Sequence, residues 1–285
     1  GVELAQMMRR MGVKVTLVTR SHLLLGAEPE VSQALADAFS AEGITLLTGL
    51  SYDSVRRDAA GVTLRIMQGG EPVEVTADHL VSTAGRRANT GGLGLEDIGV
   101  KTDARGSIVT RDDMQTTVPG IYAAGDVTDR DQFVYMAAYG AKLAAKNAVL
   151  GDDQRYDNSA MPWVVFSDPQ VAGVGLSEQQ ARDAGFDVKT SVVPLDQVPR
   201  ALAARDTRGL IKLVADKATD KLLGGQIIAP EGSDTIQTLV MALKFGMTTK
   251  ALGQTIFPYL TTVEGLKLAA QTFDMDVAKL SCCAG

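Results

Sequence analysis

The residues best suited to chemistry are two adjacent cysteines near the C-terminal end, Cys282 and Cys283, which are the only cysteines of the chain. Adjacent Cα atoms lie about 3.8 Å apart across a trans peptide, closer than in ordinary disulfides, so a bridge between these two would be strained. Thiolates are soft donors, and a two-thiolate clamp fits an ion that prefers two ligands. We therefore expect the pair to bind a soft metal such as Hg(II); an incidental terminal pair is the alternative.

A second group of residues points to a dinucleotide. The first residues, Gly1-Val2-Glu3-Leu4-Ala5, are similar to the end of a Gly-rich fingerprint in which Gly1 is the last glycine and Glu3 follows it. The residue about 20 positions further on normally is acidic and binds the NAD ribose. Here this place holds Arg20 and Ser21. A guanidinium binds a 2′-phosphate bidentately, so Arg20 favours NADPH over NADH; an ordinary solvated charge is the alternative.

The strand and loop that precede such a glycine are not in the sequence, which begins at Gly1. In a doubly wound sheet the first strand is central, and without it the remaining strands would expose unpaired edges. We therefore expect this chain to be a fragment of a longer protein.

Composition limits the kind of protein that positions these residues. The chain has 285 residues, 45% of them apolar, and a formal net charge of −6. It is long enough for two domains, and its charge argues against a nucleic-acid footprint. No uncharged apolar run approaches the roughly 18 residues of a membrane span. With so few cysteines and no visible signal peptide, we expect a soluble protein of the reducing cytoplasm, although any targeting segment upstream of Gly1 would be invisible.

The order of apolar segments predicts an α/β fold, in which partial doubly wound FAD/NAD(P)-binding domains are followed by an α+β domain. The first part should hold helices at 2–11 and 29–42, strands at 13–19, 44–47 and 79–82, and a hairpin over 62–77. The second should hold a strand-like segment at 120–124 and a helix at about 133–150. After a linker at 152–162, we expect strands near Val164, Val188, Leu210 and Leu223, a helix begun by Ser177 with Gln180 in a capping box, and helices at 234–245 and 263–273.

Two further motifs carry a family resemblance. They are Gly85-Arg86-Arg87-Ala88-Asn89-Thr90 and the segment 116–126, which ends Ala123-Ala124-Gly125-Asp126. The pair resembles the flavoprotein pyridine nucleotide-disulfide oxidoreductases. The resemblance implies that Gly85 leaves the NAD(P) domain, that Asp126 binds the ribityl chain of FAD, and that the backbone of Val134 lies near the flavin ring. Residues 162–273 resemble the dimerisation domain of this family, which implies a homodimer.

The resemblance divides the chain into four parts. These are a partial NAD(P)-binding domain at 1–85, the C-terminal part of an FAD-binding domain at 86–151, a dimerisation domain at 160–273, and a tail at 274–285 that carries the cysteine pair.

One position separates this chain from the members that reduce lipoamide or glutathione. They carry a His-Pro-Thr triplet, with a glutamate three residues later that orients the histidine as acid/base for a thiol. Here Tyr259 takes the place of the histidine, while Glu264 is kept. Together with Cys282 and Cys283, this substitution resembles the mercury(II)-reducing members of the family.

The resemblance implies a mechanism. In these members NADPH reduces FAD, which reduces a Cys-x4-Cys disulfide whose thiolates hold Hg(II) while it is reduced to Hg(0). The tail pair, Cys282 and Cys283, would take Hg(II) from thiol complexes and pass it to the inner pair of the partner subunit, with Tyr259 near that inner pair; simple packing is the alternative for Tyr259. The Cys-x4-Cys pair is absent from the sequence, so the chain alone should be inactive. A non-catalytic dimerising module that binds a soft metal, or another flavoprotein disulfide reductase, remains the alternative.

Overall fold

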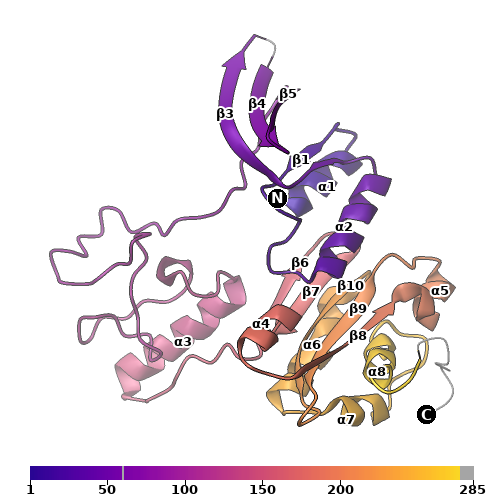
Figure 1. Cartoon of the computed structure of the whole chain (residues 1–285). Coiled ribbons are helices and arrows are strands. Elements are labelled where there is room, and N and C mark those ends of the chain that lie inside the picture. Colours follow the sequence, from indigo (N-terminus) through magenta and orange to yellow (C-terminus); the bar gives the residue numbers. More distant parts are fainter. Residues whose placement is uncertain (60, 277–285) are drawn as a thin grey trace. The chain divides into compact units, whose positions relative to one another are not determined.

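The computed structural model describes residues 1–59 and 61–276. The chain forms two compact units, of which the first combines Gly1–Ser82 with Ser159–Gly285 and the second is Thr83–Asn158 (Figure 1). Each unit is described by itself.

The first unit begins with a small parallel α/β layer. Helix α1 (Val2–Arg10) leads to β1 (Thr16–Val18), and α2 (Pro29–Ala41) leads to β2 (Thr45–Leu47), which pairs with β1 in parallel. Pro29 suits the first turn of α2 because its fixed φ is helical and its missing N–H is not needed there. The predicted helices are confirmed, and the predicted strands are confirmed in shorter form.

An antiparallel sheet of three strands follows, in the order β3-β4-β5. It consists of β3 (Leu50–Asp58), β4 (Gly61–Gln68) and β5 (Glu71–Ala77). The predicted hairpin over 62–77 is therefore confirmed, whereas β3 was not predicted. Its sequence, Ser51 to Asp58, is mostly polar and exposed, so it lacks the apolar pattern from which strands are recognised.

Two predicted strands are wrong. Residues 79–82 are not a strand in the described structure, and Leu80 and Val81 are exposed there. Residues 120–124 form only an isolated bridge, between Gln115 and Tyr122. Both segments are apolar, but a strand needs a neighbouring backbone to pair with, and composition does not report whether one is present.

The second half of the first unit is built on a sheet of five antiparallel strands in the order β6-β7-β10-β9-β8. Its strands are β6 (Pro162–Val165), β7 (Gln170–Gly175), β8 (Val188–Pro194), β9 (Leu210–Asp216) and β10 (Leu222–Ala229). The helices are α4 (Glu178–Asp183), α5 (Pro199–Ala204), α6 (Gly232–Lys244), α7 (Thr249–Gln254) and α8 (Glu264–Gln271), with a 3-10 turn η2 (Leu195–Gln197). The capping box of Ser177 and Gln180 is present at the start of α4, as predicted.

Both faces of this sheet are covered. Side chains alternate along a strand, so neighbouring residues face opposite sides. On one side Ile211, Leu213 and Ile227 join the core formed with α6 and α8. On the other side Val171 and Ile228 pack with α2 and the loop before it. The parallel α/β layer and the five-stranded sheet therefore share one apolar core.

The second unit, Thr83–Asn158, is mostly irregular chain around one helix. It holds the short turn η1 (Asp126–Thr128) and α3 (Val134–Leu150), which confirms the predicted helix. A small core forms where Met114, Leu143 and Ala144 pack with Tyr122 and Tyr156.

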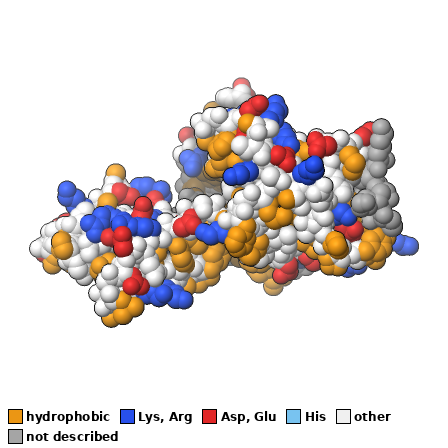
Figure 2. All heavy atoms as spheres, turned by 90° about the horizontal axis from the view of Figure 1, so that it is seen from below, with side chains coloured by type: hydrophobic (Ala, Val, Ile, Leu, Met, Phe, Trp, Pro, Cys, Tyr) orange, Lys and Arg blue, Asp and Glu red, His pale blue; other side chains and the backbone are white. Residues whose placement is uncertain are grey.

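Charged side chains of both signs are interspersed on the face of the molecule seen in Figure 2.

Among the described residues, none of the helices has the length and apolar character that crossing a membrane requires.

Candidate functional site

The predicted nucleotide-binding residues lie in the first unit, at the ends of α1 and β1. Gly1 is the N-cap of α1, and Glu3 lies in its first turn. The carboxylate of Glu3 accepts a hydrogen bond of 2.7 Å from the backbone N–H of Phe166, which follows β6. Glu3 thus already has one partner from the part of the chain that follows β6.

Arg20 and Ser21 follow the carboxyl end of β1, the edge at which α/β sheets bind their ligands. Their carbonyl oxygens accept hydrogen bonds from the N–H groups of Leu50 (3.1 Å) and Gly49 (3.4 Å). The Arg20 side chain is exposed, and it forms no hydrogen bond or ion pair with the described part of the chain. The backbone there is held while the guanidinium is available to an anion.

The second unit brings together two of the motifs singled out from the sequence. Gly85 has φ +117°, a conformation that suits glycine, and the next residue, Arg86, reaches the Asp126 carboxylate at 3.5 Å. Arg86 also donates to the carbonyl of Gln132 at 3.5 Å. Both contacts are long, so the exposed Asp126 carboxylate retains acceptor capacity for a ligand hydroxyl.

The backbone beside Asp126 fits a closely approaching group. Gly125 has φ +81°, and a Cβ there would lie 3.1 Å from the Cβ of Ala137 on α3. Val134, the first residue of α3, is 84% exposed. Glycine backbone, an available carboxylate and an open helix start are compatible with a flavin cofactor at this place.

The segment around Tyr259 precedes α8. The Tyr259 side chain is 60% exposed, whereas Glu264 is 3% exposed. The Glu264 carboxylate accepts a hydrogen bond of 3.2 Å from the backbone N–H of Leu260, and its own N–H donates to the hydroxyl of Thr261 at 3.3 Å. Leu260 has φ +64°, which only glycine adopts without strain.

This backbone differs from what a His-Pro-Thr triplet would have. Proline at position 260 has neither the N–H that Glu264 binds nor access to a positive φ. The retained glutamate therefore holds the backbone next to Tyr259. Sequence reasoning placed Tyr259 and Glu264 but missed Leu260, although a leucine in the place of the proline was a visible signal.

The predicted metal ligands Cys282 and Cys283 lie outside the described residues. Within residues 1–59 and 61–276, no group of three or more His, Cys, Asp or Glu side chains is placed to hold a metal ion. The chain before this end is attached to the sheet, because the Lys189 ammonium of β8 lies 4.9 Å from the centre of the Phe273 ring.

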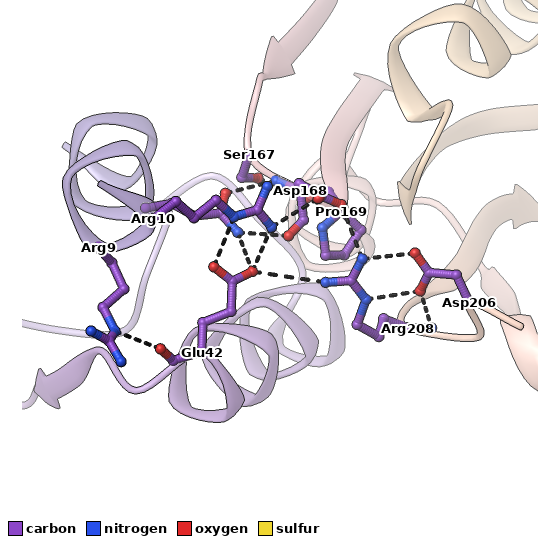
Figure 3. Close-up of polar contacts among 9 residues, drawn as sticks. Arg9, Arg10, Glu42, Ser167, Asp168, Pro169, Asp206 and Arg208 are labelled. Carbon is purple, nitrogen blue, oxygen red and sulfur yellow. Dashed lines mark hydrogen bonds and ion pairs between the residues drawn. The ribbon is translucent and has the colours of Figure 1, made fainter. Parts of the chain in front are cut away.

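A charged network that sequence reasoning missed connects α1 and α2 to the sheet (Figure 3). Glu42, at the end of α2, binds Arg10 at 2.6 Å, and Asp168 binds both Arg10 (2.8 Å) and Arg208 (3.0 Å). Arg208 also binds Asp206 at 2.7 Å. Hydrogen bonds from Arg10 lower the pKa of Glu42, and those from Arg208 lower the pKa of Asp206.

A second charged cluster surrounds Lys212 of β9, whose side chain is 2% exposed. Its ammonium lies 3.0 Å from Glu28, 3.1 Å from Glu30 and 2.9 Å from Glu178. Burial alone would lower the pKa of Lys212, but the carboxylates outweigh burial and raise it. A lysine within the apolar run Leu210 to Ala215 was the sequence signal for this cluster.

Comparison with known proteins gives two family matches. Residues 1–145 match the model described as pyridine nucleotide-disulphide oxidoreductase, and residues 161–270 match the dimerisation domain of the same family.

Curated relatives match the chain along its whole length. Mercuric reductase of Bacillus cereus is 46% identical over 286 residues, which covers 100% of this chain and 45% of the relative. Mercuric reductase of Streptomyces lividans is 46% identical over 285 residues and is covered to 60%. The chain thus spans about half the length of the curated relatives it matches.

Solved structures agree in fold. LpdA of Mycobacterium tuberculosis aligns with a TM-score of 0.84 at 27% identity, over 95% of this chain and 59% of that one. The HOCl-induced flavoprotein disulfide reductase RclA of Escherichia coli, solved as a Cu(II) complex, aligns with a TM-score of 0.84 at 25% identity, over 95% and 61%.

Proposed function

Because the chain belongs to the pyridine nucleotide-disulphide oxidoreductase family, we propose that it is the nucleotide-binding and dimerisation part of a mercury(II) reductase. The reaction would reduce Hg(II) to Hg(0) with two electrons from NADPH, leaving NADP+ and a proton, in the detoxification of mercury. Identity of 46% to mercuric reductases along the whole chain supports this proposal.

The single observation that carries the proposal is the arrangement around Tyr259. Reduction of a disulfide substrate needs an acid/base group for the leaving thiolate, and Tyr259 stands where the relatives that reduce lipoamide or glutathione carry the histidine that does this. Glu264 does not compensate, because it holds the backbone of Leu260. A metal ion bound by thiolates requires no such proton transfer, so Hg(II) suits this site better than a disulfide.

Two cofactors follow from the proposal. Gly1, Glu3, Arg20 and Ser21 would bind NADPH, with the Arg20 guanidinium on the 2′-phosphate. Gly85, Asp126 and the backbone at Val134 would bind FAD, Asp126 accepting a hydrogen bond from a ribityl hydroxyl. FAD, when bound, would supply the carrier of two electrons between NADPH and the mercury site.

Cys282 and Cys283 would take Hg(II) from thiol complexes by ligand exchange, one thiolate replacing another at the metal. They would then pass the ion to the redox-active cysteine pair that the family resemblance implies, with Tyr259 beside it. The protein would act as a homodimer through residues 161–270, which match the dimerisation domain. Its proposed compartment is the cytoplasm, where thiols stay reduced.

The test uses the whole protein that carries this chain and separates its two half-reactions. Replacing Cys282 and Cys283 together with alanine should slow Hg(II) reduction from a bulky thiol complex such as Hg(II)-glutathione. It should leave the reduction of bound FAD by NADPH unchanged, since that step does not involve the tail. Stopped-flow absorbance follows the flavin, and loss of Hg(II) follows turnover. If both steps fall equally, or neither falls, the role of the tail in mercury capture is refuted.

A further inference from the structure

The loop that carries Arg20 and Ser21, residues 19–28, is fastened by side chains of the dimerisation half. Its start is fixed by the β2–β3 connection through the Leu50 and Gly49 N–H groups. Its end is fixed by Gln226 of β10, which is 5% exposed. The Gln226 amide donates to the carbonyl of Gly26 at 3.0 Å and accepts from the N–H of Glu28 at 2.6 Å.

Lys212 fixes the same end of the loop through the Glu28 side chain. One Glu28 oxygen lies 3.0 Å from the Lys212 ammonium, and the other accepts a hydrogen bond of 2.6 Å from the N–H of Glu178. Glu28 is itself buried. A buried carboxylate with both oxygens bound has little freedom, so the residue at the end of the loop is immobilised.

Gln226 and Lys212 act as a pair. They are direct partners in the register of β10 and β9, so their side chains emerge side by side on the face of the sheet that α2 covers. Neither belongs to the nucleotide half of the chain. The five-stranded sheet thus contributes two buried polar side chains to a loop of the nucleotide half, beside the apolar residues Val171 and Ile228.

We propose that Gln226 and Lys212 are positioning residues that hold the 19–28 loop in the shape in which Arg20 meets the 2′-phosphate of NADPH. The inference rests on the proposed function, because it requires Arg20 to bind that phosphate. A guanidinium binds a phosphate bidentately only in a defined orientation, so loss of the fastening should weaken recognition of the phosphate more than that of the rest of the nucleotide.

The test is titration calorimetry of the whole protein with adenosine 2′,5′-bisphosphate and with 5′-AMP. The dissociation constant of 5′-AMP divided by that of the bisphosphate reports the contribution of the 2′-phosphate alone. In Gln226→Leu we expect this ratio to fall about fivefold to tenfold, a loss of binding free energy similar to the net contribution of one hydrogen bond. The control is Gln170→Leu on the same sheet, which removes the hydrogen bond of 2.9 Å that the Gln170 side chain accepts from the N–H of Ser233 in α6. It should leave the ratio unchanged.

Arg20→Ala separates the two ways of failing. If Arg20→Ala removes the preference for the bisphosphate but Gln226→Leu does not, the proposed function stands and the positioning role is wrong. If Arg20→Ala leaves the preference intact, the phosphate site itself is wrong. Gln226→Asn keeps the amide on a shorter side chain and serves if the leucine variant does not fold; it should lower the ratio in part, and an unchanged ratio overturns the proposal.

Discussion

At the scale of single residues, Leu260 shows how one backbone conformation separates two chemistries. A left-handed conformation costs a leucine about 1–2 kcal/mol relative to glycine, yet it lets the Leu260 N–H meet the buried Glu264 carboxylate. The strain is therefore compensated locally. The Glu264 carboxylate binds the backbone here because the residue at 260 can donate a hydrogen bond.

We predict that Leu260→Gly leaves the free energy of unfolding within about 0.5 kcal/mol of the parent. The relief of backbone strain offsets the greater freedom that glycine gives the unfolded chain. Leu202→Gly, in α5 where φ is helical, is the control and should lose about 1 kcal/mol. Urea denaturation measures both. A loss in Leu260→Gly as large as in the control would contradict the account of strain.

Replacing Arg20 with glutamate should reverse the cofactor preference of the whole protein. The new carboxylate repels a 2′-phosphate and accepts hydrogen bonds from ribose hydroxyls, so NADH should become the better reductant, with a change in selectivity of at least about tenfold. Steady-state kinetics with each nucleotide measures this. Arg57→Glu changes an exposed arginine on β3 by the same charge and should have no effect on selectivity; equal effects would remove Arg20 from the site.

At the scale of elements, the charged network of Figure 3 ties the C-terminal ends of α1 and α2 to the turn between β6 and β7. Gln6 adds to it, since its amide donates to the Asp168 carbonyl at 2.7 Å and accepts from the Asp168 N–H at 2.8 Å. Both helices are thus held at their C-terminal ends by residues within 161–270, the part that matches the dimerisation domain.

This network predicts the response to acid. The folded-state pKa values of Glu42 and Asp206 are lowered, so their contribution to stability is present above the unfolded pKa, near about 4, and is lost as the pH falls through the folded pKa. Arg208→Met removes the partner of Asp206 and should move the midpoint of acid unfolding to higher pH. Circular dichroism during acid titration measures the midpoint. Arg56→Met, which breaks only the exposed pairs with Glu74 and Asp58, should not shift it.

The elements also show what a sequence can and cannot report. The helices at Val2, Pro29, Ser177 and Val134 were predictable because caps, proline and apolar spacing are local signals. The strand predicted at His79 was wrong, and β3 was missed, because pairing depends on partners distant in the sequence. Among the site residues, Arg20 and Asp126 could be named from motifs. Gln226 and Lys212 could not be linked to Arg20, since their contacts with the loop arise from a packing of two domains that no local pattern encodes.

At the scale of the whole molecule, the five-stranded sheet packs against other elements on both of its faces. One face packs with α6 and α8, and the other packs with α2 and the loop that carries Arg20. The two segments of the first unit, separated in sequence by Thr83–Asn158, should therefore unfold together.

Phe39→Ala tests this coupling. Phe39 of α2 is fully buried in the core shared with Val171 and Ile228, so its truncation should cost about 3–5 kcal/mol. The loss should appear in the emission of Trp163, the only tryptophan, which lies across the shared core on β6. Phe245→Ala truncates an exposed ring and should cost far less. Two separate transitions, with Trp163 unaffected by Phe39→Ala, would show that the halves unfold independently.

The two-sided sheet also constrains how such proteins exchange parts during evolution. A dimerisation domain covered on one face only could be recombined freely between relatives, but here the outer face carries Gln226, Lys212, Val171 and Ile228, which fit one particular α2 and loop. A chimera that joins this C-terminal domain to the nucleotide half of another reductase must inherit both sides of that contact, or it will expose apolar strands and an unpaired lysine. Crossover points within this part of the chain are therefore expected to keep residues 20–42 and 163–228 from the same parent.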